Sequence, residues 1–345
     1  MDVLVCGAQK PFVTGGAEQA HDNLVAAFRA EGHQAELVRL PVAWEKDRVF
    51  DAPLAWRMIP ADADLVVATN FPSYYVRHPR KVVWLFHQHR GVYELADADF
   101  SDIGMDDPSF ETQRRLAEWD TRVLGEARTL FTLSRTVADR LARFNGLTGV
   151  PLYHPPPLAD RLSPGESGDY LFCATRLEHN KRPEKVLQAA LGSTRGVRAV
   201  VAGRGTLAGR LDELAATGPS GQVELRGFVD DDELVDLYRH ALGVLYAPVD
   251  EDYGYATLQA FLAGKPVITA SDSGSVLEFV EDGVTGYVTD GSPQQLAAAA
   301  DRLAADPEHA AAMGAEGRRR VEGWDWSSVV TQLIAGADGA GAGGA

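Results

Sequence analysis

The amino-acid sequence predicts two α/β domains, each a doubly wound parallel sheet with helices on both faces. Three observations support this prediction. The chain has 345 residues, which is more than one hydrophobic core usually supports. Short apolar runs alternate with helical stretches, a pattern typical of parallel strands that are buried on both faces. A proline-rich segment near the middle separates two such series, so we expect a domain boundary there.

The first series of predicted strands lies in the first 150 residues. Between the apolar runs, residues 16–31 and 108–128 show the periodicity of amphipathic helices. Gly32 and Gly146 stand where helices should end, because glycine readily adopts the left-handed conformation of a helix C-terminus. The apolar runs that we predict as strands are 3–6, 35–39, 64–69, 81–86 and 129–134.

The second series follows a proline triplet at 155–157, which can continue neither a helix nor a central strand. We expect an N-terminal domain at 1–155, a C-terminal domain at 156–325, a final helix at 326–336 and a tail at 337–345 with nothing apolar to bury. The predicted strands of the second series are 170–175, 197–203, 223–227, 242–248, 265–270 and 286–289.

Composition and charge exclude several classes of protein. With 45% hydrophobic and 24% charged residues, the chain is globular rather than disordered or fibrous. A formal net charge of −16 disfavours binding to the phosphate backbone of nucleic acids. The start lacks a basic signal region, and no apolar run approaches the ~20 residues that span a bilayer. We therefore expect a cytoplasmic protein, and the excess of Arg over Lys suggests GC-rich coding and a bacterial source.

Two smaller features also lead to expectations. Arg77, Arg80 and Lys81 form a basic cluster; a solvated surface patch is the favoured interpretation, with at most weak peripheral contact with an anionic membrane. Cys6 and Cys173 each lie in a short apolar run, which predicts buried free thiols rather than a disulfide.

Glycines and basic residues follow the first strand of each half. Gly15 and Gly16 open the first helix, and the backbone N–H groups of such a helix start can bind a phosphate or a sugar hydroxyl. An ordinary tight turn would use the same glycines. Arg176 and Lys181 come directly after run 170–175, and two permanent cations there suit a diphosphate. A solvated loop is the alternative for this pair.

A second glycine pattern follows run 197–203. Gly203-x-Gly205-x-x-Ala208, with Glu224 about 20 residues further on, formally matches a dinucleotide fingerprint. This match leaves a nicotinamide-dependent oxidoreductase as an alternative function. Against it, the match lies in the middle of the chain and no hydride-transfer pair stands out.

The most informative stretch is DEDYGYATLQA at 250–260. Glu251 precedes a helix start at Gly254, and Gln259 lies a little over two helical turns further on. An acidic acceptor beside the positive end of a helix suits the hydroxyls and the phosphates of a sugar nucleotide. A capped surface helix would also explain acidic residues at a first turn.

Taken together, the motifs resemble family 4 of the retaining glycosyltransferases. The segments that carry the resemblance are, in order, TGGAE, RLEHNK, VVAGRG, RGFVDDDELVDLYRHA, EDYGYATLQAFLAGKPVI and DSGSVLEFVEDGVTGYVT. The resemblance covers nearly the whole chain and is strongest from Asp169 to Thr289. It implies the GT-B architecture, in which two Rossmann-like domains face each other across a cleft. The first domain would bind the acceptor, the second the sugar nucleotide, and the final helix would cross back to the first.

The resemblance also implies roles for individual residues. Arg176 and Lys181 would hold the donor diphosphate, Glu251 would contact hydroxyls of the donor sugar, and His87 would lie beside that sugar, with His89 a weaker candidate. The family's second glutamate is Gln259 here, and a neutral amide would accept more weakly from the ribose. The remaining donor-binding residues that we expect are Gly15, Gly16, Gly203, Gly205, Phe228, Val229, Tyr253, Gly254 and Tyr255.

The resulting hypothesis is a retaining transfer of a sugar from a nucleoside-diphosphate sugar to a hydroxyl acceptor. We expect no cofactor and no metal, because Arg176 and Lys181 can neutralise the diphosphate. The Asp-x-Asp pairs Asp62/Asp64 and Asp97/Asp99 are attributed to chance in an acidic chain. The alternatives are a nucleotide-sugar epimerase or phosphorylase of similar fold and the oxidoreductase. The sequence does not identify the nucleobase, the sugar or the acceptor.

Overall fold

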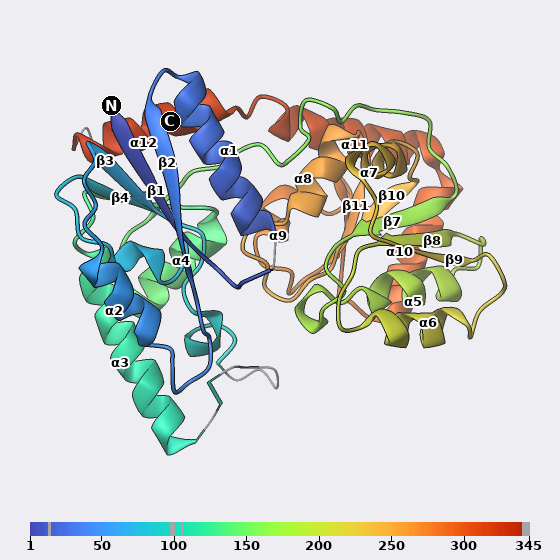
Figure 1. Ribbon diagram of the computed structural model, residues 1–345. Helices are drawn as coiled ribbons and strands as arrows, with labels where there is room; N and C mark the ends of the chain where they lie inside the picture. The colour runs from blue at the N-terminus through green and yellow to red at the C-terminus, as the bar shows by residue number, and fades with distance from the viewer. Residues whose placement is uncertain (13–14, 97–100, 102, 105, 340–345) are drawn as a thin grey trace. The chain divides into compact units, whose positions relative to one another are not determined.

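The computed structural model describes the whole chain except residues 13–14, 97–100, 102, 105 and 340–345 (Figure 1). The chain forms two compact units. Unit 1 comprises Met1–His154 and Asp325–Ala345, and unit 2 comprises Pro155–Trp324. The chain therefore passes from one unit to the other twice, once after His154 and once after Trp324.

Unit 1 is a parallel sheet between two layers of helices. Its strands are β1 Asp2–Gln9, β2 Gln34–Pro41, β3 Leu65–Ala68, β4 Lys81–Leu85, β5 Thr129–Thr132 and β6 Val150–Pro151. Its helices are α1 Gly16–Ala30, α2 Asp51–Met58, α3 Asp107–Leu124, α4 Arg135–Asn145 and α12 Trp326–Ala337, with 3₁₀ turns η1 Ser73–Tyr75 and η2 Arg90–Val92. The strand order is β2-β1-β3-β4-β5-β6, and all pairs are parallel.

Side chains of the central strand β4 alternate between the two faces of this sheet. Val83 and Leu85 belong to the core that also contains Leu116 of α3. Trp84 points to the other face, where its ring lies 6.2 Å from that of Trp326 in α12. Figure 1 shows α12, the red end of the chain, on the sheet of unit 1 beside α1.

Unit 2 repeats this arrangement. Its strands are β7 Tyr170–Ala174, β8 Arg198–Ala202, β9 Val223–Gly227, β10 Gly243–Leu245, β11 Val267–Ala270 and β12 Gly286–Thr289. Its helices are α5 Glu184–Gly192, α6 Ala208–Ala215, α7 Asp231–Arg239, α8 Tyr255–Leu262, α9 Val276–Phe279, α10 Pro293–Ala305 and α11 Pro307–Val321, with a 3₁₀ turn η3 His179–Lys181. The order is β12-β11-β10-β7-β8-β9, again with parallel pairs.

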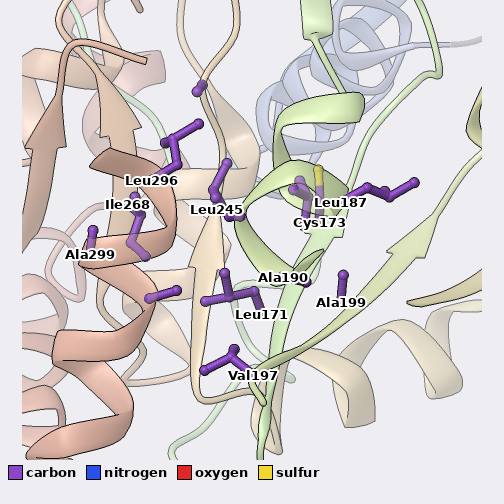
Figure 2. Close-up of a cluster of buried hydrophobic side chains, with 14 of the residues drawn as sticks. Leu171, Cys173, Leu187, Ala190, Val197, Ala199, Leu245, Ile268, Leu296 and Ala299 are labelled. Atoms are coloured by element: carbon purple, nitrogen blue, oxygen red, sulfur yellow. The ribbon is translucent and has the colours of Figure 1, made fainter. Parts of the chain in front are cut away.

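The core of unit 2 also follows the alternation of its central strand. Leu171 and Cys173 of β7 face the apolar side chains of α5 and α10, such as Leu187 and Leu296 (Figure 2). Phe172, between them in the sequence, points to the opposite face and packs edge-on against Tyr238 of α7, with ring centroids 4.8 Å apart. Each sheet is thus buried on both faces, which explains its nearly continuous apolar strands.

The predicted fold class, two doubly wound parallel sheets, is confirmed. Every apolar run predicted as a strand overlaps one, and Gly32 and Gly146 adopt the left-handed backbone conformation expected after helices α1 and α4. Cys6 and Cys173 are buried and free, as predicted. Sequence reasoning missed β6 and α2, which have two and eight residues and are too short for a clear period.

The prediction of a basic cluster on the surface is wrong for Lys81. Lys81 is only 1% exposed, and its ammonium group donates to the carbonyls of Tyr74 and Val123 at 3.0 and 2.9 Å. Arg80 forms an ion pair with Asp338 of the C-terminal segment. A membrane-binding patch at these residues would therefore lack Lys81, which is buried, and Arg80, which is paired with Asp338. Within the described part of the chain, no helix is both long and apolar enough to cross a membrane.

A buried carboxylate lies in the core of unit 1. Asp120 of α3 is fully buried and accepts hydrogen bonds from the hydroxyls of Tyr75 and Tyr93, both at 2.7 Å. Burial raises the pKa of Asp120 to about 6, and the hydrogen bonds oppose this rise. Because an unfolded aspartate has a pKa of about 3.9, the folded state binds a proton more tightly than the unfolded state between these values.

We expect this carboxylate to make unit 1 less stable as the pH rises from about 4 to above 6. Replacing Asp120 by Asn should remove this dependence. The free energy of unfolding of the wild type, relative to Asp120→Asn, should then fall by on the order of 2–3 kcal/mol across that range. Tryptophan fluorescence during urea unfolding reports mainly on unit 1, because Trp324 is the one tryptophan in unit 2. A difference that is constant with pH would contradict the raised pKa.

Candidate functional site

Each sheet has a position where the chain reverses the direction in which strands are added. In unit 2 this position lies between β7 and β10, and in unit 1 between β1 and β3. Loops at the carboxyl ends of the two strands diverge there, and open α/β sheets bind ligands at that point. The predicted site residues Lys181 and Glu251 follow β7 and β10, so they flank the position in unit 2.

Lys181 and Glu251 form the centre of the candidate site in unit 2. The Lys181 ammonium group pairs with Glu251 Oε2, and both side chains are only slightly exposed, at 13% and 12%. The hydroxyl of Tyr246 donates to the same oxygen at 2.8 Å, and Lys181 Nζ lies 3.4 Å from that hydroxyl. Burial, with a further contribution from Glu251, raises the pKa of Tyr246 well above its usual range, so this hydroxyl stays a donor.

Backbone hydrogen bonds hold Glu251 in place. Its N–H donates to the carbonyl of Ser273 at 3.2 Å, and its carbonyl accepts from the N–H of Ser275 at 2.9 Å. Gly254 caps helix α8 with φ = 83°, a left-handed conformation that favours glycine. The loop after β10 is thereby fastened to the loop after β11, and helix α8 begins four residues after Glu251.

The other predicted residues of unit 2 lie at the same edge of the sheet. Arg176 is exposed directly after β7. Phe228, just after β9, is 69% exposed, and the guanidinium of Arg204 lies 5.3 Å from its ring centroid. Tyr253 is buried, and its ring meets that of Tyr255 edge-on at 5.6 Å. Val229 is half-buried beside Phe228.

The glycine pattern at 203–208 has an explanation within the protein. A Cβ atom on Gly203 would lie 1.8 Å from the carbonyl oxygen of Thr175, and one on Gly205 would lie 2.4 Å from that of Leu177. These glycines let the loop after β8 pack on the loop after β7. Glu224 lies near the start of β9 and pairs with arginines, whereas a ribose-binding acid of a dinucleotide fold follows its strand. The fingerprint match therefore gives little support to an oxidoreductase.

Gln259 uses both ends of its amide inside unit 2. Its Oε1 accepts from the hydroxyl of Tyr238 at 3.0 Å, and its Nε2 donates to the carbonyl of Pro157 at 3.1 Å. A carbonyl can only accept, so the orientation of the amide is fixed. A ribose could still use the second lone pair of Oε1 or the second N–H of Nε2, and binding of ribose by Gln259 stays a prediction.

We expect Gln259→Glu to destabilise unit 2 by ~1–3 kcal/mol, because a carboxylate cannot donate to Pro157. Gln222→Glu is the matched control, because it also removes an amide that donates to a backbone carbonyl. Gln222 Nε2 donates at 2.6 Å to the carbonyl of Ala190, which lies in α5. Urea unfolding followed by circular dichroism gives the stability, and calorimetry with uridine diphosphate gives the affinity. A tenfold gain in affinity without loss of stability would instead support a ribose contact.

In unit 1 the predicted residues lie in the loops after β1 and β4. His87 is half-buried, and its Nδ1 lies 2.9 Å from the carbonyl oxygen of Gln88. His89 is 2% exposed, and its Nε2 lies 3.1 Å from the carbonyl oxygen of Trp44. Gly15 caps α1, and its N–H donates to Glu18 Oε2 at 2.8 Å. An anion at this helix start, where Gly16 is the first helical residue, would compete with that carboxylate.

Sequence reasoning missed Tyr246, Tyr238 and the pair between Arg182 and Asp272, whose side chains form two hydrogen bonds at 2.9 and 2.5 Å. Both tyrosines are buried, and no motif around them in the sequence indicates these hydrogen bonds. Among the residues described here, no three His, Cys, Asp or Glu side chains form a group able to hold a metal ion. Asp97 and Asp99 lie outside the described residues.

The fold is that of the GT-B architecture. It superimposes on Anabaena Alr3699/HepE, solved in complex with UDP and glucose, with a TM-score of 0.71 and 16% identity over 96% of this chain and 98% of that one. A glycosyltransferase from Rickettsia africae gives a TM-score of 0.72 and 13% identity over 99% of each chain.

Sequence comparison then shows a similarity to known glycosyltransferases within unit 2. Residues 160–320 match the family model described as glycosyl transferases group 1. D-inositol 3-phosphate glycosyltransferase of Streptomyces scabiei is 31% identical over 52% of this chain and 40% of its own length. GDP-mannose-dependent alpha-(1-6)-phosphatidylinositol monomannoside mannosyltransferase of Mycobacterium tuberculosis is 35% identical over 47% and 46%. The chain thus spans less than half the length of these curated relatives.

Proposed function

We propose that this protein transfers a sugar from a nucleoside-diphosphate sugar to a hydroxyl acceptor, with retention at the anomeric carbon. The observation that carries the proposal is the cluster of Lys181, Glu251 and Tyr246 at the point of strand reversal in unit 2. It combines a cation for a phosphate with a fixed anionic acceptor for hydroxyls. The match to glycosyl transferases group 1 and the GT-B neighbours support the same reaction class.

In the proposed reaction, the bond between the anomeric carbon and the diphosphate breaks, and its electron pair passes to the leaving phosphate oxygen. The acceptor oxygen attacks from the same face, and its proton moves to that phosphate oxygen. The products are a glycoside and a nucleoside diphosphate. The sugar carries positive charge as the bond breaks, as in glycoside hydrolysis, while negative charge collects on the diphosphate.

The side chains have separate tasks in this scheme. The ammonium of Lys181 has three N–H donors; Glu251 and Tyr246 accept from two directions, and the third would reach the diphosphate together with Arg176. Glu251 would accept from hydroxyls of the donor sugar. The N-terminus of α8 adds a partial positive charge. Two fixed cations would do the work of a metal, so we also propose metal-independent transfer.

Further roles are proposed on the resemblance. His87 would contact the donor sugar from unit 1, and Gly15 and Gly16 would face the phosphates and the acceptor. Phe228, stacked with Arg204, would lie near the nucleobase, because a planar guanidinium over a ring forms a surface on which a base can stack. No feature of this surface selects one base.

A panel of donors tests the function. The uridine, guanosine and thymidine diphosphate sugars should be screened by thermal shift, since a ligand at 100 times its dissociation constant stabilises a protein by ~2.7 kcal/mol. The stabilising donor is then incubated with hydroxyl acceptors, with and without excess EDTA. We expect release of nucleoside diphosphate only when an acceptor is added, and no loss with EDTA. Release without acceptor, a free epimer, or a requirement for manganese would each contradict the proposal.

A further inference from the structure

The buried carboxylate of Asp120 connects the elements that surround the segment after β4. On one side it accepts from Tyr75 of η1 at 2.7 Å, and on the other from Tyr93, which ends η2, also at 2.7 Å. These donors are neutral hydroxyls. A buried carboxylate held in this way costs stability compared with an apolar residue, so its presence in this core calls for a reason beyond packing.

One reason lies in Gln88, the residue that follows His87. The Gln88 side chain is buried, and its Nε2 lies 3.0 Å from Asn145 Oδ1 and 3.5 Å from Asp120 Oδ2. Asn145 in turn donates to Thr121 Oγ1 at 2.8 Å. Helices α3 and α4 therefore hold the Gln88 side chain, and Asp120 holds both Gln88 and Tyr93, at the two ends of the segment 88–93.

Gln88 also contacts the imidazole of His87 through its main chain. The Gln88 carbonyl lies 2.9 Å from His87 Nδ1, and because a carbonyl only accepts, Nδ1 must carry a proton. In the neutral ring, Nε2 then has the lone pair and can accept from a hydroxyl. The N–H of Phe71 donates to the His87 carbonyl at 3.0 Å, which holds the main chain of His87 in place.

We propose that Gln88 and Tyr93, anchored on Asp120, are positioning residues that set the ring direction and the tautomer of His87. This inference rests on the proposed function, in which His87 contacts the donor sugar. On this proposal, the carboxylate of Asp120 stays in the core because it has several acceptor positions. One acidic group can therefore hold both ends of the segment 88–93 against α3.

Two tyrosines provide a matched test. Tyr93→Phe and Tyr75→Phe each remove one hydroxyl that donates to Asp120 at 2.7 Å, and both rings are buried. We expect both variants to show a similar fall in melting temperature. Only Tyr93→Phe should lower kcat, by about tenfold, because misplaced catalytic groups slow the reaction steeply; Tyr75→Phe should stay within about twofold of the wild type. Equal kcat values for the two variants would overturn the proposal.

A double-mutant cycle tests whether Gln88 acts through His87. If it does, Gln88→Ala should lower kcat in the wild type but have no further effect in His87→Ala. Independent, multiplicative losses would show that Gln88 has only a structural role.

Nitrogen NMR of histidine-labelled protein provides a readout that needs no substrate. The signal absent from His87→Ala identifies His87, and we expect its Nδ1–H tautomer in the wild type and in Tyr75→Phe, with a mixture in Gln88→Ala. An unchanged tautomer in Gln88→Ala would overturn the proposal. If no donor sugar is turned over by the wild type, the proposed function fails, whereas this measurement still decides whether Gln88 positions His87.

Discussion

Replacing Lys181 or Arg176 by Ala should lower turnover by ~10²–10³-fold, the range seen when one preorganised charge-stabilising donor is lost. For Lys181 the structure adds a second reason. Its removal also leaves the nearly buried carboxylate of Glu251 without its cation, so the acceptor for the sugar would lose its orientation. We therefore expect Lys181→Ala to be the more damaging of the two.

The measurement is kcat with saturating donor, together with urea unfolding to verify the fold. Arg210→Ala is a suitable control, because Arg210 is 76% exposed on α6 and its salt bridge to Glu213 is on the surface. The control should match the wild type. Full activity in the Lys181→Ala/Arg176→Ala double variant would remove the proposed mechanism, and rescue of either variant by magnesium would show that a metal can replace the fixed cations.

The fold was predictable because its signals are local and repeated. Short apolar runs such as 170–175 correspond to strands such as β7 because both faces of each sheet are covered, and left-handed glycines such as Gly146 mark helix ends. The predicted Lys181 and Glu251 meet because both follow strands at the point of reversal. Their sequence positions are 70 residues apart, and only the strand order brings them together.

The failures also have physical causes. Lys81 looks like a surface residue in the sequence, yet the carbonyls of Tyr74 and Val123 accept from it inside the core. Gly203 is predicted to bind the donor, and the carbonyl of Thr175 gives the protein a separate need for glycine at this position. In each case the partner lies far away in the sequence or in another loop. Sequence spacing identifies the residue type that a backbone position needs, and it leaves open whether protein or ligand imposes that need.

Gln259 shows the same limit at the motif itself. The spacing from Glu251 matches the pattern of two glutamates, but the amide serves Tyr238 and Pro157. An amide can donate and accept at once, and a carboxylate cannot. The departure from the family pattern is thus accompanied by a contact that requires it, which the sequence alone could not reveal.

Replacing Glu251 by Gln should lower kcat by ~10²-fold while leaving the affinity for the nucleoside diphosphate nearly unchanged. The variant keeps the shape of the side chain but loses its charge. It would therefore lose the pair with Lys181 and the acceptor whose contacts strengthen as positive charge grows on the sugar. Hydrogen bonds to charged groups contribute ~1.5–3 kcal/mol and neutral ones ~0.5–1.5 kcal/mol, so losing more than one charged contact gives an effect of this size.

Tyr246→Phe separates the charge of Glu251 from its orientation. This change removes the hydroxyl that donates to Glu251 Oε2 at 2.8 Å and leaves the carboxylate and Lys181 in place. We expect a loss in kcat of at most about tenfold, smaller than that of Glu251→Gln, because one neutral donor is removed. Calorimetry with the nucleoside diphosphate alone and kcat with the intact donor decide the matter. If Glu251→Gln weakens binding of the diphosphate as much as it lowers kcat, Glu251 acts on the leaving group through Lys181 rather than on the sugar.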